Sequence, residues 1–205
     1  MDWCLGRIPE TQERGEPGLF HLMMHVGKWF EIHNLIKARC SSSWLTPSQQ
    51  KALRTIRELT STFGRCNLHG NVGVGKTFVA WVLSKEHGLI YFPTPNLLLD
   101  VVGTHGKFAI IDNYSERTLS YRKLAPEISI RGFLGFILIS REPIADHIHK
   151  VELTLTEADY VWVNRTLYEN LGITVPLRTE TYVGGLWRNI FCSGRVSVSG
   201  IERSP

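Results

Sequence analysis

A run of glycines that ends in a lysine and a threonine has the clearest capacity for chemistry in this sequence. Gly70 and Gly75 are separated by four residues and followed directly by Lys76 and Thr77, the spacing of a phosphate-binding P-loop. Glycines let the backbone curl close to a phosphate, so that successive N–H groups point at the anion. We expect Lys76 to reach the β- and γ-phosphates of a nucleotide and the Thr77 hydroxyl to bind Mg²⁺.

The residues on both sides of this loop have the pattern that a P-loop requires. Residues 65–69 are a short strand candidate, and the apolar run 77–83 is typical of a buried helix, whose N-terminal dipole would attract an anion. A glycine-rich turn that only joins two elements is the less favoured alternative. The predicted nucleotide contacts are Gly70, Asn71, Val72, Gly73, Val74, Gly75, Lys76, Thr77 and Phe78.

A second candidate site residue, Asp112, follows the apolar residues 108–111. A buried parallel strand delivers the carboxylate at its C-terminal end to the edge of the sheet where ligands bind. We expect Asp112 to hold Mg²⁺ together with Thr77. Taken alone, Asp112 could equally end a strand and begin a turn with Asn113, but the P-loop upstream favours the metal-binding interpretation.

A further predicted strand, residues 132–141, ends in Ser140 and Arg141. Strands of a parallel sheet end at one edge, so we expect these two side chains to lie beside Asp112 and to face the γ-phosphate.

Composition places the chain among soluble globular proteins. Of its 205 residues, 43% are hydrophobic and 20% charged, which suits one α/β domain with a small extension. The net charge of +4 is spread along the chain, so it permits an anionic partner without requiring one. The four cysteines form no C-x-x-C pair, and no leader pattern or membrane-length apolar run is present. We expect a cytoplasmic protein that has no membrane partner.

The predicted elements alternate between strand and helix. A helix over 47–63 has Thr46 as its N-cap and Gln49 three residues later, a capping box. Strands and helices then follow in turn to residue 171, which predicts a mainly parallel five-stranded sheet with helices on both faces. The expected organisation is an N-terminal arm and helix (1–44), a three-layer α/β P-loop NTPase core (45–172) and a C-terminal extension (173–205).

This order of elements resembles the P-loop ATPases in which another strand separates the P-loop strand from the strand that carries the Mg²⁺-binding aspartate, the division that includes the AAA+ proteins. The resemblance covers about residues 45–172. The run 88–102 is similar to helicase-loader and transposition-regulator ATPases, whereas the run 137–143 is similar to the signalling ATPases called STAND, in which a strand-end arginine senses the γ-phosphate. Both subgroups stay open. The resemblance implies Mg²⁺ and ATP as ligands.

The sequence departs from the AAA+ pattern at Asn113, where these enzymes usually carry a glutamate that polarises the attacking water. An amide cannot act as that base. Glu116, three residues further on, is the candidate substitute, so the predicted catalytic residues are Lys76, Asp112, Glu116 and Arg141. We expect slow or partner-dependent hydrolysis. Arg131 and Arg141 are both candidates for sensing charge in a neighbouring subunit of a homo-oligomer.

Three functions are compatible with these residues. The leading hypothesis is an ATP-dependent switch or motor of AAA+ type that acts on DNA or a nucleoprotein complex, in which Arg117, Arg122 and Lys123 face the nucleic acid. The alternative interpretation of that cluster is a solvated helix face. The second hypothesis is a nucleotide-gated assembly or signalling module with weak or no hydrolysis. The third, a small-molecule kinase, is disfavoured because no arginine-rich lid is evident between residues 140 and 174.

Overall fold

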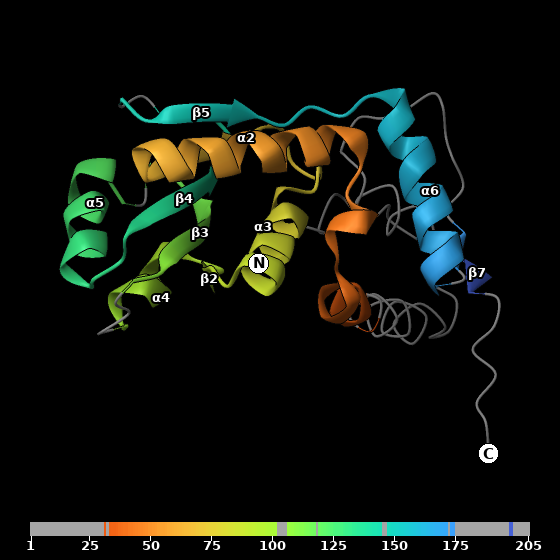
Figure 1. The fold of residues 1–205 in the computed structure, drawn as a ribbon, viewed down its shortest axis with the longest axis horizontal. Helices are drawn as coiled ribbons and strands as arrows, with labels where there is room; N and C mark the ends of the chain where they lie inside the picture. The colour runs from red at the N-terminus through yellow and green to blue at the C-terminus, as the bar shows by residue number, and fades with distance from the viewer. Residues whose placement is uncertain are drawn as a thin grey trace, which may run out of the picture. The chain divides into compact units, whose positions relative to one another are not determined.

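The computed structural model in Figure 1 describes residues 31, 33–101, 106–117, 119–144, 147–171, 173–174 and 197–198. The chain divides into two compact units, Met1–Ala38 and Arg39–Pro205. In the first unit, residues 33–38 are helical. Most of the predicted N-terminal arm, and nearly all of the predicted extension from residue 173 on, lie outside the described residues. The division at residues 44 and 172 stays a prediction.

The second unit alternates strands and helices, as the sequence predicts. Its elements are η1 (Ser42–Trp44), α2 (Pro47–Phe63), β1 (Arg65–His69), α3 (Lys76–His87), β2 (Ile90–Phe92), α4 (Pro95–Leu99), β3 (Phe108–Tyr114), α5 (Tyr121–Ile130), β4 (Gly135–Ser140), β5 (His149–Glu152), α6 (Glu157–Leu171), β6 (Ile173–Thr174) and β7 (Ser197–Val198). Within the described residues, no helix is both long enough and apolar enough to cross a bilayer.

Five of these strands form one parallel sheet in the order β2-β3-β4-β1-β5. β4 therefore lies between β1, which leads into the P-loop, and β3, which carries Asp112. The predicted α/β fold with a five-stranded parallel sheet and flanking helices is confirmed. Because all five strands run the same way, the P-loop and the ends of β3 and β4 share one edge of the sheet (Figure 1).

Helices cover both faces of this sheet. On one face, Ala109 and Ile111 of β3 and Leu138 of β4 belong to a buried cluster that includes residues from α4 and α5. Successive strand residues point to opposite faces, so Ile110 and Asp112 lie on the other side. There α3 packs against β2 and β3 and buries every residue from Phe78 to Leu83. Each fully buried leucine or isoleucine stabilises such a core by roughly 1.5–3 kcal/mol.

The buried carboxylate of Asp159 joins the N-terminal ends of α2 and α6. It accepts hydrogen bonds from the backbone N–H and hydroxyl of Ser48, at 2.9 and 2.7 Å, and from those of Thr156, at 2.7 and 2.8 Å. Burial opposes ionisation of Asp159, but these donors outweigh it and hold its pKa below the usual value. The start of α2 is therefore held in place by a residue of α6.

We expect Asp159→Asn to lower the free energy of unfolding at neutral pH by about 2–4 kcal/mol, because charge-assisted hydrogen bonds are lost and an amide N–H₂ faces donors. A pKa depressed by folding stabilises the protein only while the carboxylate is ionised. The difference from wild type should therefore shrink as the pH falls below about 4. Urea denaturation at several pH values measures both effects.

The matched control is Glu157→Gln, which changes an exposed acid in the same helical turn. Its free energy of unfolding should stay within about 0.5 kcal/mol of wild type. Equal stabilities of the two variants would contradict the role assigned to Asp159.

Candidate nucleotide-binding site

The loop between β1 and α3 needs glycine at both ends of its motif. Gly70 and Gly75 have φ of 144° and 87°, values that L side chains rarely adopt. A Cβ at Gly70 would lie 2.3 Å from the carbonyl oxygen of Leu153, and one at Gly75 would lie 2.2 Å from Nε2 of Gln49. The two glycines thus allow both the curl of the loop and its close packing against the protein.

Gln49 of α2 forms hydrogen bonds both to the helix cap and to the loop. Its Oε1 accepts the backbone N–H of Thr46 at 3.1 Å, which completes the predicted capping box, and its Nε2 donates to the carbonyl of Val74 at 3.1 Å. Gln49 is buried. The sequence identified the cap, but no local pattern pointed to the contact with Val74, 25 residues away.

The Lys76 ammonium lies inside the curl of the loop. Nζ donates to the carbonyls of Gly70 and Asn71 at 2.6 and 2.8 Å. Burial lowers the pKa of Lys76 to about 8; the charge of Asp112 opposes this shift and that of Arg141 adds to it. A polyphosphate bound here would favour the protonated amine, so Lys76 lies where an anion would recruit its charge.

The other predicted contact residues of the loop differ in exposure. Asn71 and Val72 are exposed, whereas Val74 is buried. Phe78 is also buried, and its ring packs edge-on against Trp81 with 6.5 Å between centroids.

The predicted metal ligands, Thr77 and Asp112, are brought together. Asp112 is 2% exposed, and its Oδ2 accepts the Thr77 hydroxyl at 2.7 Å and the Tyr91 hydroxyl at 2.9 Å. Mg²⁺ in nucleotide sites takes oxygen ligands from one or two side chains and completes its shell with phosphates and water. The hydroxyl and carboxylate oxygens of Thr77 and Asp112 fit that ion. Sequence reasoning missed Tyr91, for which the only signal was a tyrosine in the strand before β3.

Asn113 directly follows Asp112 and has a left-handed backbone, with φ of 52°. Asparagine is among the few residues that adopt this conformation readily. Its backbone N–H donates to Oδ1 of Asp112 at 2.7 Å, and its Nδ2 donates to the carbonyl of Pro93 at 3.0 Å. Asn113 thus ties the end of β3 to the end of β2.

Two predicted site residues, Glu116 and Ser140, form hydrogen bonds with residues other than Lys76, Thr77 and Asp112. The exposed carboxylate of Glu116 accepts from the Tyr114 hydroxyl at 3.2 Å and from the backbone N–H of Tyr121, the first residue of α5, at 3.3 Å. The buried Ser140 hydroxyl donates to the carbonyl of Glu142 at 2.6 Å and accepts from Asn67. Their roles as base and γ-phosphate contact stay predictions.

Asn67, a fully buried polar residue in β1, was also missed by sequence reasoning. Its Nδ2 donates to the carbonyl of Leu138 and to Oγ of Ser140, at 3.0 and 2.9 Å, and its Oδ1 accepts the backbone N–H of Ile144 at 3.1 Å. An amide within a buried strand is the signal that could have identified it. It holds the segment after β4 against the P-loop strand.

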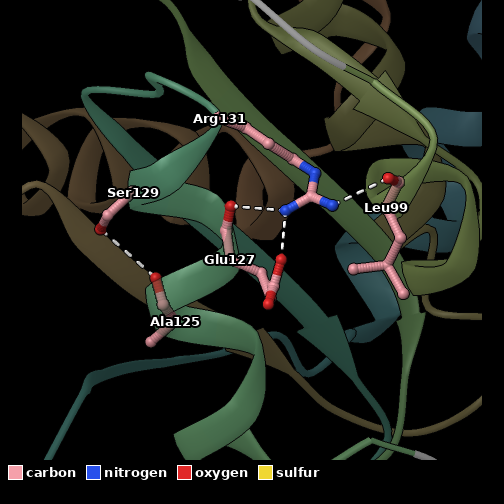
Figure 2. Close-up of polar contacts among 5 residues, drawn as sticks. All are labelled: Leu99, Ala125, Glu127, Ser129 and Arg131. Carbon is pink, nitrogen blue, oxygen red and sulfur yellow. Dashed lines mark hydrogen bonds and ion pairs between the residues drawn. The ribbon is translucent and has the colours of Figure 1, made fainter.

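The two candidate arginines differ in their surroundings. Figure 2 shows Arg131 between α5 and α4, where Nη1 contacts both the carbonyl and the carboxylate of Glu127 and Nη2 donates to the carbonyl of Leu99 at 2.8 Å. Arg141 is exposed beside the P-loop: its carbonyl accepts the Gly70 N–H at 3.2 Å, and its charge acts on Lys76. Of the two, Arg141 lies near the candidate site.

Comparisons with known proteins leave the family open. No protein-family model and no curated protein matches the sequence. Among solved structures, the chain is similar to the replication initiator DnaA bound to AMPPCP and single-stranded DNA, with 16% identity and a TM-score of 0.40 over 65% of this chain and 52% of that one. The chain thus spans about half the length of that protein. The fold assignment depends on the sheet order and the P-loop themselves, which are compatible with a P-loop NTPase.

We expect nucleotide affinity to fall as the pH rises from 7.5 to 9. Phosphate binding stabilises the charged amine of Lys76, so the complex takes up a proton around the free-state pKa of about 8, and affinity drops by up to about tenfold per pH unit above it. Isothermal titration with an ATP analogue measures the slope. Burial lowers the pKa of nearby His69, which therefore stays neutral over this range.

Lys76→Arg is the control, because a guanidinium stays charged throughout and should flatten the profile even where affinity is weaker. Equal slopes in the two proteins would show that Lys76 is not the titrating group.

We expect Arg131→Ala to lower the free energy of unfolding by about 1–3 kcal/mol, because its bonds to Glu127 and Leu99 are lost, and to leave the preference for ATP over ADP unchanged. Arg141→Ala should do the reverse: a smaller change in stability and a several-fold loss of that preference. Thermal melts and paired ATP and ADP affinities separate the two. A loss of preference in Arg131→Ala at unchanged stability would reverse the assignment.

Proposed function

We propose that this chain is an Mg²⁺- and ATP-binding switch or motor of the AAA+ type that acts on a nucleic-acid complex. The observation that carries the proposal is the 2.7 Å hydrogen bond from Thr77 to Asp112, which joins the first residues of the P-loop helix to the end of β3. Lys76 lies beside this pair, inside the loop. The position of β4 between β1 and β3 further supports the AAA+ division.

In this proposal the loop supplies the phosphate site. Backbone N–H groups at the start of α3 bind the phosphates, and Lys76 exchanges the carbonyls of Gly70 and Asn71 for phosphate oxygens. Thr77 and Asp112 hold Mg²⁺, which neutralises charge on the β- and γ-phosphates. Arg141 senses the γ-phosphate from the end of β4.

Hydrolysis is slow in this proposal and gains speed from a partner. The amide of Asn113 cannot accept a proton from water at neutral pH, and Glu116 is engaged with Tyr114 and the start of α5. An arginine supplied by a neighbouring subunit can raise such a rate by orders of magnitude. ATP would thus hold one state of the chain until an assembly forms.

The nucleic-acid part of the proposal is supported by exposed basic residues on the segment that leaves β3. Arg117, Arg122 and Lys123 are all exposed. They follow Asp112 along the chain, on the segment after β3 and the first turn of α5. A nucleotide-dependent movement of Asp112 would reach them through few intervening residues. Each such residue that neutralises a phosphate releases counterions and makes binding salt-dependent.

The second candidate is a nucleotide-gated assembly module with no nucleic-acid partner. Asn113 favours it, because its left-handed backbone and its bond to Pro93 suit a residue that shapes a binding site rather than one that activates water. Oligomer size measured by light scattering with and without Mg-ATP tests this candidate, and a constant monomer would count against it.

The experiment for the leading proposal compares wild type, Lys76→Ala and Asn113→Glu, each with and without DNA. We expect tight Mg-ATP binding and slow turnover in wild type, and a loss of both in Lys76→Ala. A gain of turnover in Asn113→Glu would identify the missing carboxylate as the limit. Wild-type protein that binds no nucleotide would exclude the proposal.

The DNA arm measures affinity over a salt series with and without Mg-ATP. Replacing both Arg122 and Lys123 by alanine should reduce the slope of log K against log salt by about 2. Arg57→Ala, an exposed arginine on α2, is the control and should leave the slope unchanged. An affinity that Mg-ATP never alters would leave the assembly module as the better candidate.

A further inference from the structure

The hydroxyl of Tyr91 lies against the carboxylate that the proposed function assigns to Mg²⁺. β2 and β3 pair in parallel with Tyr91 opposite Ile110, two residues before Asp112. Side chains two residues apart in a strand share one face, so Tyr91 and Asp112 lie on the same side of the sheet. The tyrosine hydroxyl donates to Oδ2 of Asp112 at 2.9 Å.

The same carboxylate accepts two other donors. Thr77 donates to Oδ2 at 2.7 Å, and the backbone N–H of Asn113 donates to Oδ1 at 2.7 Å. A carboxylate has about four lone-pair positions, so three donors leave one, on Oδ1, for a metal ion or a water of its shell. Together the donors fix which oxygen faces the ion and which faces the protein.

Toward Asp112 the Tyr91 hydroxyl is the hydrogen-bond donor. Burial, and then the negative charge of Asp112, raise the pKa of its hydroxyl above the ordinary value. The phenol therefore keeps its proton at neutral pH and donates it in a hydrogen bond to Oδ2 of Asp112. Asp112 is almost fully buried, so each donor offsets part of the cost of holding its charge out of water.

We propose that Tyr91 is a positioning residue that orients Asp112 for Mg²⁺ and so sets the metal dependence of nucleotide binding. This role rests on the proposed function, because it requires Asp112 to be a metal ligand. Without the tyrosine hydroxyl, Oδ2 retains Thr77 as its donor, and the carboxylate can rotate when the ion arrives. The ion is then bound less tightly, while the loop contacts to the phosphates are unchanged.

The test is Tyr91→Phe, which removes one oxygen and keeps the ring. ATP affinity is measured in EDTA and across an Mg²⁺ titration. We expect the Mg²⁺ concentration for half-maximal enhancement to rise about three- to tenfold, and the affinity in EDTA to stay within about twofold of wild type. Mn²⁺ binding to the ATP complex, followed by electron paramagnetic resonance, should weaken by the same factor and reads the ion directly.

Tyr121→Phe is the matched control, since it removes the hydroxyl of a buried tyrosine, which accepts from Arg65 on the other face of the sheet. Tyr121→Phe should change neither the ATP affinity in EDTA nor the Mg²⁺ concentration for half-maximal enhancement. In an Asp112→Asn background, Tyr91→Phe should have no further effect on the Mg²⁺ titration, because the group through which it acts is gone.

The outcomes distinguish the two proposals. A wild-type protein that binds nucleotide with Mg²⁺ dependence, together with a Tyr91→Phe variant that has the same Mg²⁺ titration, overturns the positioning role and leaves the proposed function intact. An equal loss of affinity in EDTA and in Mg²⁺ also overturns it, because Tyr91 would then act on the fold of the site. A wild-type protein that binds no nucleotide overturns both.

Discussion

The constraint on which the site depends is the burial of one carboxylate, that of Asp112, near the C-terminal end of β3 in the parallel sheet. A buried charge is costly unless hydrogen-bond donors surround it. Here the donors come from three places: Thr77 on α3, Tyr91 on β2 and the backbone after Asp112 itself. Satisfying that charge therefore fixes how α3 packs on the sheet and how β2 aligns with β3, and the same packing places Lys76 inside the loop.

The P-loop is held by two kinds of contact that a phosphate would affect differently. Val74 is held by Gln49, a buried residue of α2 whose capping box connects through Ser48 and Asp159 to α6. Gly70 and Asn71 are held by Lys76, the group that an anion would recruit. Binding would thus release the first half of the loop and leave the second half attached to the helices. Adjustment to the ligand would begin near Gly70, which also contacts the backbone of Arg141 after β4.

Local patterns predicted much of this arrangement, and contacts between distant residues account for the rest. The P-loop, the strand that ends in Asp112 and the cap of α2 depend on spacing within a few residues, so the sequence was sufficient for them. Tyr91 and Asn67 act through partners on other strands, and no local pattern reports those. Arg131 and Arg141 look alike in sequence. Only the fold separates an arginine that joins α5 to α4 from one that lies beside Lys76.

In the proposed function, the conformation of Asn113 would slow hydrolysis in addition to the chemistry of its amide. Asn113 has a φ of 52°, a value that asparagine tolerates and that costs most L residues about 1–2 kcal/mol. Its side chain is also engaged with Pro93. A carboxylate at this position would have to meet that conformational cost and break that contact before it could polarise a water. In the proposed function, the geometry at the end of β3 and the neutral amide of Asn113 would both favour a nucleotide-held state over rapid hydrolysis.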